Sequence, residues 1–138
     1  TKSMLAVWRE WGLDTLLKKA YRAGTIMSGV SAGAICWFQN GITDSWSSNL
    51  KVMTCMNLIK GCCCPHYDEE PERKPTVKKL LNANKFNNIF AVDGGAALHI
   101  NNEAIYKSIV FKKNKSAYLV CKDKGEIIEK SYRKIILI

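Results

Sequence analysis

Residues 25–38 have the sequence TIMSGVSAGAICWF, and this stretch decides the fold class. The short apolar run 25–30 predicts a buried strand, and 32–38 predicts a helix that ends at the Asn-Gly pair of residues 40 and 41. Ser31 alone separates the two segments. A buried strand followed at once by a helix is typical of α/β proteins with a parallel sheet.

The segments on either side continue this alternation. Towards the N-terminus, apolar residues at helical spacing predict a first helix that stops at Gly12 and a second, capped by Asp14, that stops at Gly24. Towards the C-terminus we expect, in order, a weak strand at 57–59, a polar loop at 62–75, a helix capped by Thr76 and ending near 85, a buried strand at 88–92, a hairpin of 96–100 with 104–111, and β-rich runs at 116–121 and 126–138. The first two-thirds therefore predicts α/β with a parallel sheet, and the last third an antiparallel or mixed sheet.

The chain has 138 residues, of which 47% are hydrophobic and 24% charged. This length and balance predict one globular domain over residues 1–138 and exclude disordered, collagen-like and coiled-coil proteins. No apolar run approaches the roughly 18 residues that cross a bilayer, and no apolar segment near the N-terminus resembles a signal peptide. We therefore expect no membrane association and a cytoplasmic location.

The chain carries 21 Lys and Arg against 12 Asp and Glu, a formal net charge of +9. Most of this excess lies after residue 104, where lysines alternate with β-branched and aromatic residues as on a half-solvated strand. No nucleic-acid-binding signature accompanies them. A solvated sheet face explains the charge, so we expect no nucleic-acid partner; a basic nucleic-acid binder would instead show steeply salt-dependent binding.

The six cysteines are expected to be reduced thiols, because no secretory signal is present and a core of this size needs no disulfides. Cys62, Cys63 and Cys64 are adjacent, and with His66 they raise the question of a zinc site. Neighbouring side chains on an extended segment point to opposite faces, and no Cys-x-x-Cys pair or second ligand cluster completes a tetrahedron. We therefore expect no metal site.

The strongest chemical motif is Gly29-Val30-Ser31-Ala32-Gly33, a G-x-S-x-G between a predicted strand and a predicted helix. This context is that of a nucleophile elbow, a turn so sharp that its neighbours must be small and its serine hydroxyl is exposed. The Ala32 N–H would then help to stabilise an oxyanion. The alternative is a small-residue turn that serves only packing between strand and helix.

A serine nucleophile needs a base, and the chain has two histidines. His66 lies in a polar loop from which an imidazole could reach a neighbouring strand end. His99 lies in an alternating segment that predicts a strand residue on a sheet face. We favour His66, although either residue could be a structural or surface histidine.

The third member of a triad is a carboxylate that orients the imidazole, and two residues qualify. Asp93 ends an apolar strand and is followed by two glycines, and it would give the chain order Ser, His, Asp. Asp44 follows the predicted serine helix and would give the order Ser, Asp, His of α/β-hydrolases. Each could equally be a turn or capping residue.

Four motifs in consistent order and spacing resemble a known family. They resemble the dipeptidase E family (peptidase E, aspartyl dipeptidase) of serine peptidases, to which cyanophycinase also belongs, and the similarity extends from about Ser3 to about Ile109. The motifs are residues 30–38, residues 43–45, the segment Pro65-His66-Tyr67-Asp68 with Arg73, and residues 92–98.

The resemblance implies a flavodoxin-like fold, related to class I glutamine amidotransferases, in which helices flank the sheet. It implies that Ser31 is the nucleophile, that His66 is the base, and that short peptides with an N-terminal aspartate are the preferred substrates. An arginine recognises the substrate carboxylate in this family, and Arg73 is the nearest candidate. The resemblance implies neither a metal nor another cofactor.

Two departures from the family pattern stand out. The family's acidic residue aligns with Gly94, so Asp93 could serve only if the turn shifts its carboxylate by about one position. The chain also opens at about the Thr of the family's Gly-Gly-Asn-Thr loop, without the N-terminal sheet strands that precede that loop. We therefore expect the C-terminal part of a longer peptidase domain, with an open sheet edge that a missing N-terminal segment or self-association would cover.

The leading hypothesis is a serine peptidase that hydrolyses short peptides through Ser31, His66 and Asp93 or Asp44, with the Ala32 amide at the oxyanion. The alternative is a catalytically inactive homologue that acts as a binding or oligomerisation module. A lipase or esterase would share the G-x-S-x-G motif, but the usual His-Gly-Gly oxyanion motif is absent from the sequence.

Overall fold

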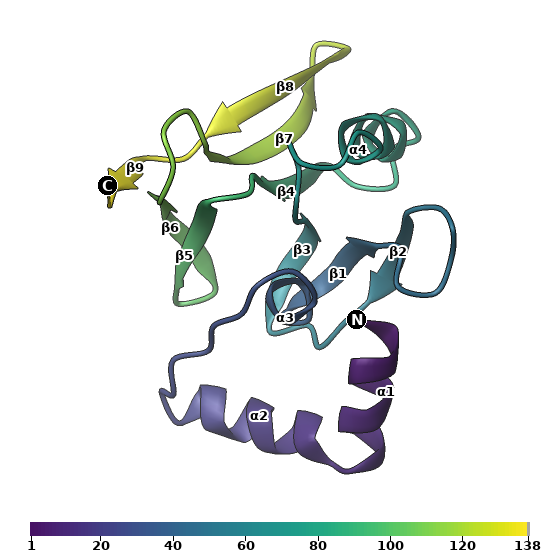
Figure 1. Cartoon of the computed structure of the whole chain (residues 1–138), viewed down its shortest axis with the longest axis vertical. Helices are drawn as coiled ribbons and strands as arrows, with labels where there is room; N and C mark the ends of the chain where they lie inside the picture. The colour runs from purple at the N-terminus through teal and green to yellow at the C-terminus, as the bar shows by residue number, and fades with distance from the viewer. Residues whose placement is uncertain (138) are drawn as a thin grey trace.

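A six-stranded mixed sheet forms the centre of the computed structural model, which describes residues 1–137 (Figure 1). Its strand order is β2-β1-β3-β4-β7-β8. The strands β1, β3 and β4 run parallel, whereas β2, β7 and β8 are antiparallel to their neighbours. This confirms the α/β class and the change to antiparallel pairing in the last third. The bounds are β1 (Phe38–Thr43), β2 (Lys51–Thr54), β3 (Ile59–Cys64), β4 (Asn88–Val92), β7 (Ala117–Asp123) and β8 (Glu126–Ser131).

A second sheet contains the predicted hairpin. Its order is β5-β6-β9, with bounds Ala96–Asn101, Ala104–Val110 and Lys134–Ile136. The strands β5 and β6 are antiparallel, and β9 runs parallel to β6. Asn102 and Glu103 form the two-residue turn between β5 and β6, both with positive φ, as tight hairpin turns of this length require. The hairpin prediction is confirmed.

The two predicted N-terminal helices are present as α1 (Lys2–Glu10) and α2 (Leu13–Arg22). Gly12 rather than Asp14 precedes α2, and its left-handed backbone (φ 68°) turns the chain between the two helices. The helix α4 (Arg73–Asn82) begins three residues before the expected Thr76. Figure 1 shows α2 at the opposite end of the molecule from β7 and β8. No helix within residues 1–137 is long and apolar enough to span a membrane.

The strand predicted at residues 25–30 is wrong. This segment has no regular secondary structure and pairs with no strand among the described residues, and Ile26 and Val30 are 92% and 83% exposed. A strand needs a neighbour to accept its hydrogen bonds, and apolar composition does not supply one. The helix that follows, α3 (Ala32–Ile35), is also shorter than predicted. The chain continues into β1, where a Cβ on Gly41 would lie 2.8 Å from Ile35, so Gly41 permits close packing rather than ending a helix.

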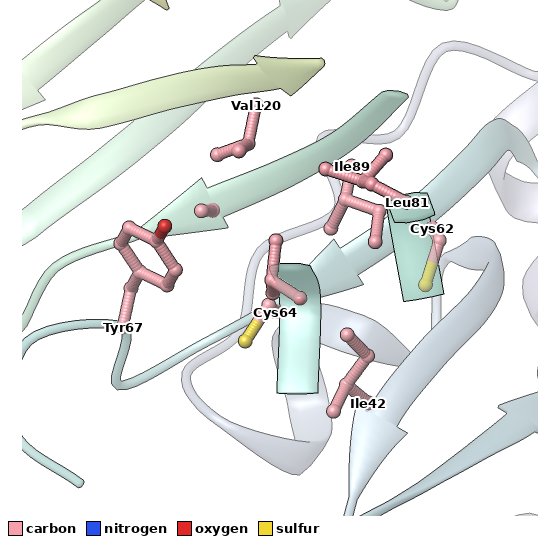
Figure 2. Packing of buried hydrophobic residues seen from close by; sticks show 9 residues of the cluster. Ile42, Cys62, Cys64, Tyr67, Leu81, Ile89 and Val120 are labelled. Atoms are coloured by element: carbon pink, nitrogen blue, oxygen red, sulfur yellow. The ribbon is translucent and has the colours of Figure 1, made fainter. Parts of the chain in front are cut away.

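The three adjacent cysteines are core residues of β3 and do not begin a polar loop. Figure 2 shows Cys62 and Cys64 with Ile42, Leu81 and Ile89, in a cluster that joins α4 to β1, β3 and β4. Cys63 packs on the opposite face in a cluster with Ile35 of α3. The alternation therefore buries both faces of β3, as expected for a central parallel strand. All six thiols are free, and burial raises the pKa of Cys64 to about 12.

Candidate active site

Ser31 lies in a sharp turn at the start of α3. Its backbone has φ 53° and ψ −116°, a conformation that non-glycine residues rarely adopt outside functional sites. The Gly33 N–H donates to the Val30 carbonyl at 2.9 Å, which closes the turn. A Cβ on Gly29 would lie 2.0 Å from the Gly33 carbonyl oxygen, so the turn requires glycine at position 29. The small residues of the G-x-S-x-G motif are therefore a steric requirement of this turn.

His66 follows the carboxyl end of β3, beyond Pro65, and also has a positive φ of 53°. Its Nε2 atom lies 2.9 Å from the Oγ atom of Ser31. The fold thus brings together two predicted residues that are 35 positions apart in the sequence. They meet where the parallel strands end, the edge at which α/β sheets usually bind ligands.

The acidic partner of His66 is Glu69, which was not among the predicted acids. Its Oε2 atom lies 2.7 Å from His66 Nδ1, and its N–H donates to the His66 carbonyl in the same tight turn. A carboxylate only accepts hydrogen bonds, so the proton of a neutral imidazole belongs on Nδ1. Nε2 is then free to accept the proton of the Ser31 hydroxyl. The signal in the sequence was the three-residue spacing between His66 and Glu69.

Neither predicted acid is bonded to His66 within the part of the chain that the structure describes. The Asp93 carboxylate is buried, and its Oδ2 atom accepts hydrogen bonds from the Ser116 N–H at 3.0 Å and the Tyr118 hydroxyl at 3.3 Å. Burial raises the pKa of Asp93, against the opposing effect of the Ser116 N–H. Asp44 lies exposed in the turn after β1. The structure therefore brings Glu69, and neither aspartate, to the imidazole.

The loop that carries His66 and Glu69 is held by contacts with several strands. The Tyr67 hydroxyl donates to Glu129 of β8 at 2.6 Å, and its N–H donates to the Val92 carbonyl of β4. Asp68 accepts the Gly94 N–H at 2.8 Å and pairs with Lys115. Although partial burial acts to raise the pKa of Asp68, the hydrogen bonds from Lys115 and Gly94 lower it below its usual value. The geometry of the site therefore depends on the packing of the whole sheet.

Arg73, the predicted substrate-binding arginine, does not face the cleft. It is 3% exposed, its Nε atom donates to Glu70, with which the guanidinium also forms an ion pair, and its Nη1 atom donates to the Ile42 carbonyl at 2.9 Å. These bonds fix the start of α4 to the carboxyl end of β1. This placement does not support a substrate-binding role, because a buried guanidinium that does not line the cleft cannot meet a substrate carboxylate there.

Replacing Arg73 with methionine is expected to lower the free energy of unfolding by about 1–3 kcal/mol, because it leaves the Ile42 carbonyl buried without a partner. Urea unfolding measures the change. Arg9→Met, at an exposed position of α1, is the matched control and should stay within about 0.5 kcal/mol. Equal stability of the two variants would contradict the structural role of Arg73.

The Ala32 amide is available at the serine. Among residues 1–137 its N–H donates to no other group, whereas the amides of Gly33, Ala34 and Ile35 are engaged in the turn. Its position directly after Ser31 is the one that supplies an oxyanion donor at a nucleophile elbow. The Ala32 N–H is therefore free to donate to an oxyanion, as the predicted role requires.

A cleft of about 1430 Å³ opens beside Ser31, His66 and Glu69. Its walls are the segment 24–31 on one side and residues 92–103, including β5, on the other. Within the described residues, Arg22 at the end of α2 is the one Lys or Arg side chain that lines it. His99 also lines the cleft, but its ring packs edge-on against Tyr106, with ring centroids 5.5 Å apart. Of the two histidines, His66 is the one bonded to the serine.

No group of three His, Cys, Asp or Glu side chains in the described part of the chain is placed to hold an ion. The cysteines beside His66 point into the two cores of the sheet.

A half-buried serine on a sharp turn, with a histidine bonded to it at the edge of an α/β sheet, defines a hydrolase-like site. Comparison with known proteins places the chain in a class of peptidases. Residues 1–108 match the model of peptidase family S51, and the chain belongs to this family. This confirms the resemblance to dipeptidase E and cyanophycinase, and the sheet with flanking helices agrees with the flavodoxin-like fold of the family.

A curated relative is the uncharacterized peptidase YgaJ of Bacillus subtilis (strain 168). It is 38% identical over 129 residues, which cover 94% of this chain and 56% of YgaJ. The chain therefore spans little more than half the length of this relative.

Proposed function

We propose that the chain carries the catalytic residues of a serine peptidase that hydrolyses short peptides. One observation carries the proposal: an unbroken hydrogen-bonded series runs from Ser31 Oγ through His66 Nε2 and Nδ1 to Glu69 Oε2, with lengths of 2.9 Å and 2.7 Å. This is the arrangement of a nucleophile, a general base and an orienting acid. Membership of a peptidase family supports the same reaction class.

In the proposed mechanism, the Ser31 hydroxyl attacks the carbonyl carbon of the scissile peptide bond while His66 Nε2 takes its proton. The Ala32 N–H donates to the oxyanion of the tetrahedral intermediate. His66 then returns the proton to the leaving amine, which departs and leaves an ester on Ser31. Water, deprotonated by the same histidine, hydrolyses the ester, and Glu69 stabilises the imidazolium in both halves of the reaction.

Labelling with a fluorophosphonate tests this proposal directly, because the reagent reacts with an activated serine. We expect one adduct per chain by intact mass, located on Ser31 by peptide mapping. A folded chain that acquires no adduct, or acquires it on another serine, would contradict the proposal.

For the substrate, we propose short peptides with an N-terminal aspartate, whose side-chain carboxylate pairs with Arg22. The support is the position of Arg22 as the one Arg or Lys side chain on the cleft wall within the described residues. Arginine binds carboxylates in a planar, two-bond geometry that suits such recognition.

Arg22→Gln is therefore expected to raise KM for an Asp-X dipeptide by about 10- to 100-fold, the range that a hydrogen bond to a charged group gives. Hydrolysis of the matching Ala-X dipeptide should change little. Lys19→Gln, one turn earlier on α2 and outside the cleft, is the control. An equal effect of Arg22→Gln on both dipeptides would refute selective recognition.

A second candidate function is that of a catalytically inactive module that binds a partner or a second copy. The observation in its favour is the apolar wall of the cleft, where Ile26 and Val30 are almost fully exposed. This function predicts a mass that rises with concentration in sedimentation analysis, together with no fluorophosphonate adduct. Adduct formation on Ser31 would exclude it as the sole function.

A further inference from the structure

Gly94 lies directly against the carboxylate of Glu69. A Cβ atom built on Gly94 would fall 1.9 Å from Oε1, 2.1 Å from Cδ and 2.7 Å from Oε2 of Glu69. These distances are far below van der Waals contact, so a side chain at position 94 and the observed Glu69 carboxylate cannot coexist. The φ angle of Gly94 lies outside the left-handed range that side chains rarely adopt. Space, and not backbone strain, therefore requires glycine at this position.

We infer that Gly94 is a positioning residue: the absence of its side chain lets Glu69 reach His66, and a carboxylate placed at position 94 can take over the role of Glu69. This inference rests on the proposed function, because it concerns the acid of the same series. The free space at Gly94 also explains why the acid bonded to His66 is Glu69, from the loop after β3, and not Asp93 at the end of β4.

The distances around Glu69 Oε2 indicate that an aspartate at position 94 can replace Glu69 as the partner of His66. Glu69 Oε2 lies 2.7 Å from His66 Nδ1 and 2.7 Å from the Cβ position of residue 94. A carboxylate oxygen of aspartate lies two bonds from its Cβ, at about 2.4 Å. An aspartate at position 94 can therefore place an oxygen near the point that Glu69 Oε2 now occupies.

The backbone around Gly94 is held more firmly than the side chain of Glu69. The Gly94 N–H donates to Asp68, and the preceding Asp93 is anchored by Ser116 and Tyr118. The Glu69 side chain is 46% exposed, and His66 is its one side-chain partner among the described residues. A new side chain at position 94 is therefore expected to displace Glu69 and leave the main chain in place.

Four variants of the full chain test this inference: Gly94→Ala, Glu69→Ala, the double variant Glu69→Ala/Gly94→Asp, and the matched double variant Glu69→Ala/Gly94→Asn. Two readouts are compared for each. One is the rate of fluorophosphonate adduct formation on Ser31. The other is the downfield proton resonance of the His66 Nδ1–H in chains with ¹⁵N-labelled histidine, which requires a carboxylate partner and no catalysis.

We expect Gly94→Ala to lose the downfield resonance and to label within about tenfold of Glu69→Ala, although it retains Glu69. The Asp double variant should recover the resonance and label at least about 100-fold faster than its Asn counterpart, since an orienting acid is worth on the order of 10⁴ in rate. Thermal unfolding of each variant confirms that the comparison is made between folded chains.

Two results would overturn the inference. One is a Gly94→Ala chain with the wild-type resonance and labelling rate; the other is an Asp double variant that matches its Asn counterpart in both readouts. Failure of the proposed function is a different result, namely a folded wild-type chain without an adduct on Ser31. In that case the resonance of His66 in the four variants still decides the role of Gly94.

Discussion

Replacement of Ser31 by alanine is expected to lower the kcat/KM for Asp-X dipeptides by roughly 10⁶-fold, the loss seen when a triad serine is removed from a comparable hydrolase. The reason is local. Ser31 holds the one hydroxyl bonded to His66 in the described structure, so no neighbouring side chain can replace it as nucleophile. The fluorophosphonate adduct should disappear with the activity.

Ser28→Ala is the matched control for this experiment. Ser28 lines the same cleft three residues earlier, in the exposed segment before the turn, and it forms no hydrogen bond with His66. We expect wild-type hydrolysis and labelling from this variant. Hydrolysis that survives in Ser31→Ala, with an unchanged melting temperature, would refute Ser31 as nucleophile.

The second large effect separates Glu69 from Asp93 as the orienting acid. Glu69→Gln should lower kcat by about 10⁴-fold, because an amide nitrogen next to His66 Nδ1 favours the wrong tautomer, as in the corresponding variant of a well-characterised triad. Asp93→Asn should keep kcat within about tenfold, since the Asp93 carboxylate accepts from Ser116 and Tyr118 and not from His66.

The measurement is steady-state hydrolysis of an Asp-X dipeptide by the two variants, with urea unfolding as a check on stability. Burial raises the pKa of Asp93, so a neutral amide at this position should cost the fold little. The reverse ranking, with Asp93→Asn nearly inactive and Glu69→Gln nearly normal, would instead identify Asp93 as the acid that orients His66.

The pairing of Ser31 with His66 could be predicted because each residue has a local signature. The G-x-S-x-G motif places a serine on a tight turn, and His66 was predicted in a polar loop from which its imidazole could reach a neighbouring strand end. The strand at 88–92 was also predicted with its observed bounds, since a short apolar run between polar residues has few alternative structures.

Glu69 could not be predicted by the same reasoning, because its approach to His66 depends on the positive φ of His66 and on the space beside Gly94. Neither the backbone angle nor the free space can be read from the residue composition of a segment or from the spacing of its apolar residues. The strand predicted at 25–30 failed for a related reason, since pairing is a property of neighbours and not of the segment itself. The Cys62-Cys63-Cys64 run was assigned to a polar loop, although buried thiols pack as small apolar residues and here lie in the two cores of the sheet.

The loop 66–69 has a consequence for the order of events during synthesis. Its residues bond to partners far along the chain: Lys115 is 47 residues beyond Asp68, and Glu129 is 62 residues beyond Tyr67. A ribosome must therefore have released nearly the whole of this sequence before the loop can take its final shape. Until then the loop that carries His66 lacks these two contacts, so its fixed shape is one of the last features of this sequence to form.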